Sequence, residues 1–150
     1  MNLEDAYKHA FPYTIDILAK NQKGLKNLYK IISLASTVYF SRNARIPQDE
    51  LIKYHEGLLF GTSGINSRVF EIAATRNEEE LREELRFYDY VEIQPLIDAQ
   101  CYVERGRFES LKEVEKIYSR IIDCAKKENK ITYLSHRLFL HSHELQLLLS

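Results

Sequence analysis

Alternating apolar and polar residues predict short β-strands at residues 13–19 (YTIDILA) and 88–93 (YDYVEI). A compact apolar run between two glycines, residues 57–61 (GLLFG), predicts a third strand that is buried on both faces. A fourth short strand is expected at residues 131–134 (ITYL), which are rich in strand-forming side chains. The pattern therefore predicts about four strands, spread along most of the chain.

Apolar residues at three- and four-residue spacing predict helices between these strands. One helix is expected from Leu25, with an apolar face formed by Leu28, Tyr29, Ile32, Ala35 and Tyr39. A second helix follows the small residues 62–64, and Asn77 is suited to cap a third, acidic helix that ends near Arg86. Strands and helices thus alternate along the chain.

The strongest local helix signal covers residues 111 to about 128, where Ser110 and Glu113 form an S-x-x-E capping box. Strands that are separated by helices pair in parallel, so the fold class is α/β, with mainly parallel strands flanked by helices. About four strands are too few to close a barrel, which predicts a partial β/α barrel. Residues 1–150 are expected to form a single domain.

Three segments carry weaker signals. Pro47 suits the first position of a short helix that extends to His55. A helical turn is expected at residues 96–103. The last segment, residues 138–150, contains periodic leucines and is expected to form a helix that packs on the domain or binds a partner.

Composition argues for a globular protein, because the formal net charge is only -1 and the apolar content of 45% is ordinary. No apolar run approaches the roughly 20 residues that a membrane helix needs, and the N-terminus does not resemble a signal peptide. We therefore expect a cytoplasmic protein without a membrane partner. Cys101 and Cys124 match no zinc or redox spacing, which predicts free thiols.

Charge is distributed unevenly, because six cations and no acid lie between Asp16 and Asp49. Within this stretch, Lys23, Lys26 and Lys30 could contact a phosphate backbone. The alternative, which we favour at this point, is the solvated outer face of a barrel helix, since no aromatic platform for bases is evident. DNA contact therefore stays an open interpretation.

Four blocks of residues resemble one known family in their order along the chain. Residues 13–33 (YTIDILAKNQKGLKNLYKIIS) resemble the pattern Y-H-x-T-x-L-x-K-N-x-x-G-L-x-N-L-x-K-L-x-S. The blocks EGLLFGTSG, FYDYVEIQP and ITYLSHRLFL follow at 56–64, 87–95 and 131–140. The chain is thus similar to the second half of the polymerase-and-histidinol-phosphatase (PHP) domain of PolC-type bacterial DNA polymerase III alpha subunits.

This resemblance implies a segment of a β/α PHP barrel inside a DNA-directed DNA polymerase, a nucleotidyltransferase that acts in DNA replication. Members of the family hold divalent metals with His, Asp, Glu and Cys ligands. The matching positions in this chain are Thr14, Gly64, Arg68, His136 and Leu138. Of these only His136 is a good ligand, while the charge of Arg68 repels cations. We therefore expect a degenerate metal site, with no catalytic residue and no cofactor.

Three hypotheses follow from the resemblance. The first is a structural segment whose partners are the remaining domains of a replicative polymerase, or a second copy of the chain. The second is a free-standing, non-enzymatic PHP-like module for protein interaction. The third is a metal-dependent phosphoesterase whose site is rebuilt from His136, His141 and His143, against the simpler interpretation of these histidines as surface and capping residues. Whether the chain is itself an enzyme is left open.

Overall fold

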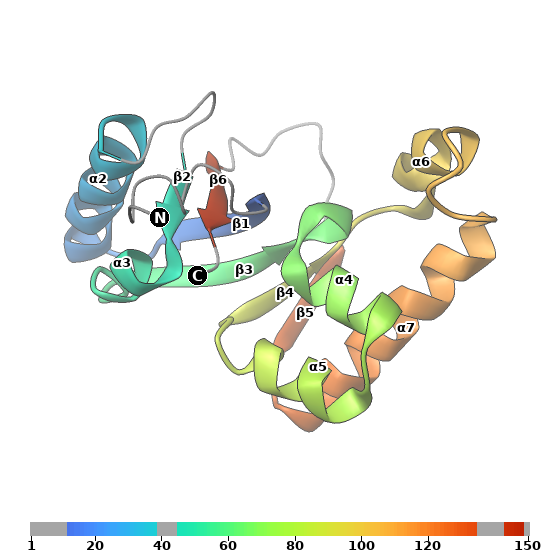
Figure 1. Ribbon diagram of the computed structural model, residues 1–150. Coiled ribbons are helices and arrows are strands. Elements are labelled where there is room, and N and C mark those ends of the chain that lie inside the picture. Colours follow the sequence, from blue (N-terminus) through green and yellow to red (C-terminus); the bar gives the residue numbers. More distant parts are fainter. Residues whose placement is uncertain (1–11, 39–44, 135–142, 149–150) are drawn as a thin grey trace, which may run out of the picture. The chain divides into compact units, whose positions relative to one another are not determined.

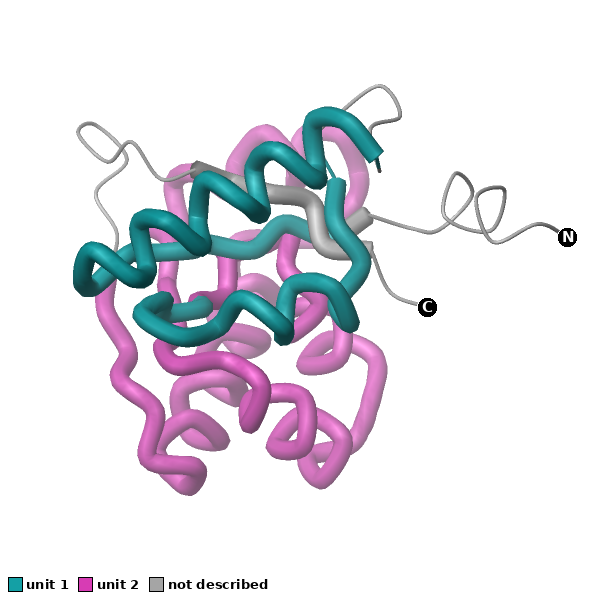
Figure 2. The backbone as a smooth tube through the Cα atoms, turned by 90° about the vertical axis from the view of Figure 1, so that its left-hand side faces the viewer, with its two compact units in different colours: residues 1–60, 142–150 teal, residues 61–141 magenta. Residues whose placement is uncertain are grey.

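The computed structural model of the chain describes residues 12–38, 45–134 and 143–148. It consists of two compact units, which Figure 2 distinguishes by colour. Unit 1 comprises residues 1–60 and 142–150, and unit 2 comprises residues 61–141. The chain passes from unit 1 to unit 2 within the strand β3 (Leu58–Ser63).

Unit 1 contains three strands that pair with one another, β1 (Pro12–Ala19), β2 (Arg45–Pro47) and β6 (His143–Leu148). The strand β6 pairs with β1 in the antiparallel direction, with Ile15 opposite Leu145. On its other side β6 pairs with β2 in the parallel direction. The C-terminal strand therefore joins two strands from the first third of the chain.

Two helices complete unit 1, α2 (Gln22–Ser36) and α3 (Gln48–Ile52), both labelled in Figure 1. The Asn21 side chain caps α2 by accepting a hydrogen bond from the Gly24 amide at 2.9 Å. A Cβ atom on Gly24 would lie 1.8 Å from the carbonyl oxygen of Gly57, so only glycine allows this approach. The amide of Asn27 strengthens the contact by donating to the Glu56 carbonyl at 2.8 Å.

Unit 2 is built on a parallel arrangement of the strands β3, β4 (Tyr90–Ile93) and β5 (Ile131–Leu134). Gly61 lies opposite Tyr90 in the β3–β4 pair, and Tyr90 lies opposite Ile131 in the β4–β5 pair. The connections are helical, as parallel strands require. They comprise η1 (Gly64–Asn66), α4 (Arg68–Thr75), α5 (Glu78–Leu85), η2 (Leu96–Ala99), α6 (Gln100–Glu104) and α7 (Leu111–Lys127).

The core of unit 2 lies where α4, α5 and α7 pack together (Figure 1). The ring of Phe70 is central, because it makes edge-to-face contacts with Phe108 and Tyr118 at centroid distances of 5.7 and 5.2 Å. Val69 on α4 and Val114 on α7 are fully buried as well. These positions follow the three- and four-residue periodicity of the sequence, which explains why both helices were predictable.

The predicted α/β class with mainly parallel strands and flanking helices is confirmed. All four predicted strands are present, as β1, β3, β4 and β5. In neither unit do the described strands close into a barrel. No helix in the described part of the chain combines the length and the apolar character that crossing a membrane requires.

Several details differ from the predictions. The described part of residues 138–150 is the strand β6 and not a helix, and β2 was not predicted. The helix after Pro47 ends at Ile52, before His55. Pro47 lies in β2, immediately before α3. Short apolar runs do not distinguish strand from helix, and here pairing between distant segments decides.

The capping box before α7 is also absent in its expected form. Ser110 makes no side-chain capping hydrogen bond. The Glu113 carboxylate instead accepts a hydrogen bond from the Glu109 amide at 2.8 Å. The glutamate thus reaches one residue further back than in a standard capping box.

Candidate functional site

Gly64 lies at the carboxyl end of β3, where ligands of α/β proteins are commonly bound. Its φ of +57° is a left-handed conformation that favours glycine. A Cβ atom at this position would lie 2.3 Å from both the amide carbon and the amide oxygen of Gln94. The Gln94 side chain, which is 6% exposed, therefore occupies the space that a side chain at position 64 would need.

The residues around Gly64 use their polar groups for local structure. The Ser67 hydroxyl donates to the Gly64 carbonyl at 2.8 Å and accepts from the Phe70 amide at 3.2 Å, which caps α4. The Thr62 hydroxyl accepts a hydrogen bond from the Glu92 amide at 3.2 Å. Thr62 thus connects β3 to β4, and Ser67 closes the turn between β3 and α4.

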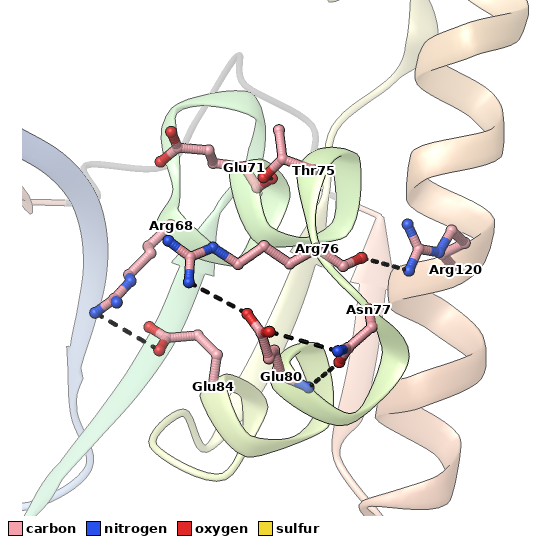
Figure 3. A network of polar contacts seen from close by, with 8 residues as sticks. All are labelled: Arg68, Glu71, Thr75, Arg76, Asn77, Glu80, Glu84 and Arg120. Atoms are coloured by element: carbon pink, nitrogen blue, oxygen red, sulfur yellow. Dashed lines mark hydrogen bonds and ion pairs between the residues drawn. The ribbon is translucent and has the colours of Figure 1, made fainter.

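Arg68, the first residue of α4, faces the carboxylate of Glu84 on α5 (Figure 3). The nearest nitrogen and oxygen atoms are 3.8 Å apart, and the Glu84 side chain is 13% exposed. Burial raises the pKa of Glu84, and the positive charge of Arg68 opposes that rise. The guanidinium thus balances a carboxylate that is largely removed from water.

Tyr88 adds to this buried group. Its side chain is 1% exposed, and burial raises its pKa, with the charge of Glu84 raising it further. The hydroxyl therefore stays protonated throughout the physiological range. Arg68, Glu84 and Tyr88 form a partly buried polar cluster, in which the ion pair between Arg68 and Glu84 links α4 to α5.

A second polar network holds the end of α4 against α7 (Figure 3). Arg120 donates to the carbonyl oxygens of Ala73 and Arg76, the latter at 3.0 Å. The Arg76 side chain pairs with Glu80 at 3.2 Å, and Asn77 caps α5 by accepting from the Glu80 amide at 2.9 Å. A cation at a helix C-terminus satisfies carbonyl groups that the helix leaves unbonded.

Arg107 fixes the turn that follows β3. It donates to the Asn66 side chain at 3.3 Å and to the Ile65 carbonyl at 3.4 Å. Its guanidinium carbon also lies 5.1 Å from the ring centroid of Tyr102 and 5.3 Å from that of Phe108. The segment after α6 is thereby tied to the carboxyl end of β3.

The positions that the family resemblance marks as ligands are only partly described. Thr14 is half-buried in β1 of unit 1, and Gly64 and Arg68 lie four residues apart in unit 2. His136 and Leu138 lie outside the described residues. Because Gly64 has no side-chain donor atom and Arg68 is a cation paired with a carboxylate, the side chains at these two positions do not fit a divalent metal.

Of the other two histidines in the alternative metal site, His141 lies outside the described residues, and His143 is the first residue of β6. Among the described residues, no group of three or more His, Cys, Asp or Glu side chains is placed to hold a metal ion. Sequence reasoning missed the position of Gln94. The long polar side chain directly after a buried strand was the signal that could have suggested it.

The three lysines named from the sequence lie on one helix. Lys23, Lys26 and Lys30 are all exposed on α2, as predicted. Tyr29, which was expected on the apolar face, is 63% exposed, and Ile31 is buried instead. The buried face of α2 is therefore rotated from the one that was predicted.

Comparison with known proteins places the chain in a family. The model of the PHP domain matches residues 1–104. DNA polymerase III PolC-type from Caldanaerobacter subterraneus is 40% identical over 120 residues, which are 79% of this chain and 9% of that protein. The Lacticaseibacillus paracasei protein of the same name is 40% identical over 126 residues, or 84% of this chain and 9% of that protein.

The relative from Staphylococcus epidermidis, also DNA polymerase III PolC-type, is 34% identical over 142 residues. The match covers 94% of this chain and 10% of that protein. The chain thus spans about a tenth of the length of these curated relatives. With the family model covering more than half of its residues, the chain belongs to the PHP domain family and is similar to PolC-type DNA polymerase III over most of its length.

Proposed function

We propose that this chain is the second half of the PHP domain of a PolC-type replicative polymerase, with a degenerate metal site and a structural role in DNA replication. In this proposal residues 1–150 act as one domain segment in the cytoplasm. The partners are the remaining domains of the polymerase, and the polymerase activity belongs to the parent protein. The similarity to PolC-type relatives over most of the chain supports this assignment.

The observation that carries the degenerate-site proposal is the Gln94 side chain in the space beside Gly64. A metal ligand at position 64 would need both a donor atom and room to project it. Neither is available, and Arg68 adds a positive charge four residues further along the chain. The same segment instead carries structural hydrogen bonds from Ser67, which supports a bracing role.

The edge of unit 2 supports a role in assembly with further polypeptide. The strand β5 pairs with β4 on one side, and no other strand of the described residues pairs with it. Ile131 and Leu134 on β5 are 72% and 56% exposed. An edge strand with exposed apolar side chains is a surface for pairing with another segment.

The first experiment is elemental analysis of the purified chain, with thermal unfolding recorded before and after addition of zinc or manganese. We expect no stoichiometric metal and no stabilisation, because a bound ion would raise the unfolding temperature by mass action. Chelator-treated protein is the control. A bound metal together with metal-dependent hydrolysis of p-nitrophenyl phosphate, lost in His136→Ala, would replace this proposal with the phosphoesterase hypothesis.

A second experiment tests the bracing role through sedimentation of the isolated chain. We expect concentration-dependent self-association that Ile131→Lys with Leu134→Lys reduces, because charges on an edge strand oppose strand pairing. Ile97→Lys, at a position 71% exposed in η2, is the matched control and should leave association unchanged. A strictly monomeric wild-type chain would favour the free-standing module instead.

A further inference from the structure

The outward face of α2 combines three lysines with an exposed aromatic ring. Lys23, Lys26 and Lys30 are exposed, and Tyr29 between them is 63% exposed. Successive residues of an α-helix are rotated by about 100°, which places these four side chains within an arc of about 120°. We call this surface the α2 cationic face.

The opposite side of the helix is the one that packs in unit 1. Its buried residues are Gly24, Asn27, Leu28, Ile31 and Ala35. They occupy an arc of about 100° that does not overlap the α2 cationic face. The exposed Tyr29 is therefore not part of the core of this unit.

The positions of the charged residues on α2 do not stabilise the helix itself. Its first turn holds Lys23 and no acidic residue, although the positive end of the helix dipole favours acids there. Lys26 and Lys30 are four residues apart, where like charges repel. Helix stability therefore does not explain this pattern, which suggests that an anionic partner does.

Within the described parts of the chain, no carboxylate forms an ion pair with the lysines of this face. The sequence contains no acid between Asp16 and Asp49. In the described structure, none of the three lysines forms an ion pair within 4.0 Å. The face thus presents a net charge of about +3 to solvent.

We propose that the α2 cationic face binds single-stranded nucleic acid. The lysines extend over about 10 Å along the helix, so their charges form a row along which the phosphates of one strand can lie. An aromatic ring beside a phosphate-binding surface offers a platform on which an unpaired base stacks, whereas the bases of a duplex are already stacked on one another. An acidic peptide would pair with the lysines, but it has no base that stacks on the ring.

The test uses the whole chain and a fluorescein-labelled oligothymidylate of about 20 nucleotides, with anisotropy recorded at about 50 mM salt. We expect saturable binding that weakens as salt is raised. The variant Lys23→Gln/Lys26→Gln/Lys30→Gln should bind about tenfold or more weakly, and the slope of log K against log salt should become shallower by about 2. Glutamine suits a helix about as well as lysine, so α2 should be retained.

The matched control is Lys112→Gln/Lys116→Gln/Lys126→Gln, which removes the same charge from exposed positions of α7. It should bind like the wild type. An equal loss of affinity in both triple variants would mean that binding depends only on the net charge of the protein, and it would overturn the proposal. No binding by the wild-type chain would overturn it as well, whatever the metal content of the protein.

Variants of Tyr29 distinguish the binding of single-stranded nucleic acid from the binding of other anions. Tyr29→Ala should weaken binding of the oligonucleotide about five- to tenfold, while Tyr29→Phe, which retains a ring, should bind like the wild type. Binding of a duplex of the same length should not respond to Tyr29→Ala. Equal affinity for both forms, or displacement of the oligonucleotide by an equal charge concentration of polyglutamate, would contradict recognition of single strands.

Discussion

The side chain of Gln94 lies where a side chain on residue 64 would have to project, with a Cβ on Gly64 falling 2.3 Å from the amide group of Gln94. The glycine at position 64 and the position of the Gln94 side chain are thus linked in unit 2. A larger residue at position 64 therefore requires a second change at Gln94. It also makes the site open to a direct energetic test.

Gly64→Ala should lower the free energy of unfolding by about 2–4 kcal/mol, because a strained left-handed conformation and a clash with Gln94 add together. Gly106→Ala is the matched control, since Gly106 has a φ of +80° but no atom within 4 Å of a built Cβ. It should cost only about 1 kcal/mol. Urea unfolding measures both values.

The contribution of Gln94 appears in the double variant. Gly64→Ala should cost less when Gln94 is already alanine, because the clash is then removed while the backbone strain remains. Equal costs of Gly64→Ala in both backgrounds would mean that Gln94 does not fill this space.

Arg68→Ala should destabilise the chain by about 1–3 kcal/mol, because it leaves the largely buried carboxylate of Glu84 without its cation. The same change in a Glu84→Gln background should cost much less, since no charge is left uncompensated. Arg68→Lys retains the charge and serves as the control. A double-mutant cycle in urea measures the coupling, and a coupling near zero would show that the pair does not interact.

The raised pKa of Glu84 predicts how stability changes with pH. A carboxyl group whose pKa is higher in the folded state binds protons more tightly there than in the unfolded chain. Its contribution to stability therefore falls as pH rises from about the ordinary value of 4.5 through the raised pKa, and levels off above it. Glu84→Gln should remove this decline from a series of urea unfolding curves, and an unchanged pH profile would contradict the raised pKa.

Glu128 predicts the opposite trend in a lower pH window. Its carboxylate pairs with Arg82 at 2.8 Å and Arg86 at 3.3 Å, and these hydrogen bonds lower its pKa below 4.5. Stability from this group is present above pH 4.5 and is lost as pH falls through the lowered pKa. Glu128→Gln should flatten that acid limb, whereas Glu115→Gln, at an exposed position of α7, should leave it as in the wild type.

Arg120→Ala should lower the free energy of unfolding by about 1–3 kcal/mol, because the carbonyls of Ala73 and Arg76 lose their charged donor. Arg120→Lys keeps one charge but not the forked geometry, so an intermediate loss is expected. Lys116→Ala, on an exposed part of α7, is the control for helix propensity. Thermal or urea unfolding measures these changes. A loss of stability no greater than that of the control would show that Arg120 does not cap α4.

Much of unit 2 could be predicted from the sequence, because its signals are local. The strand at 131–134 has the predicted bounds, and Asn77 caps α5 as expected. The helix that became α7 differs only by about one residue at its end. Hydrophobic periodicity and capping act over a few neighbouring residues, so the sequence alone determines them.

The tertiary structure decided what depends on distant partners. The segment 143–148 became a strand because it pairs with β1 and β2, whose residues lie about a hundred or more positions away, and its leucine spacing suits either element. The rotation of α2 exposes Tyr29 and buries Ile31, a choice that the packing of unit 1 makes between two apolar stripes. Gln94 beside Gly64 is likewise a contact across 30 residues. The sequence thus determined elements and family, while pairing and burial between remote segments determined the edges, the exposed surface and the surroundings of Gly64.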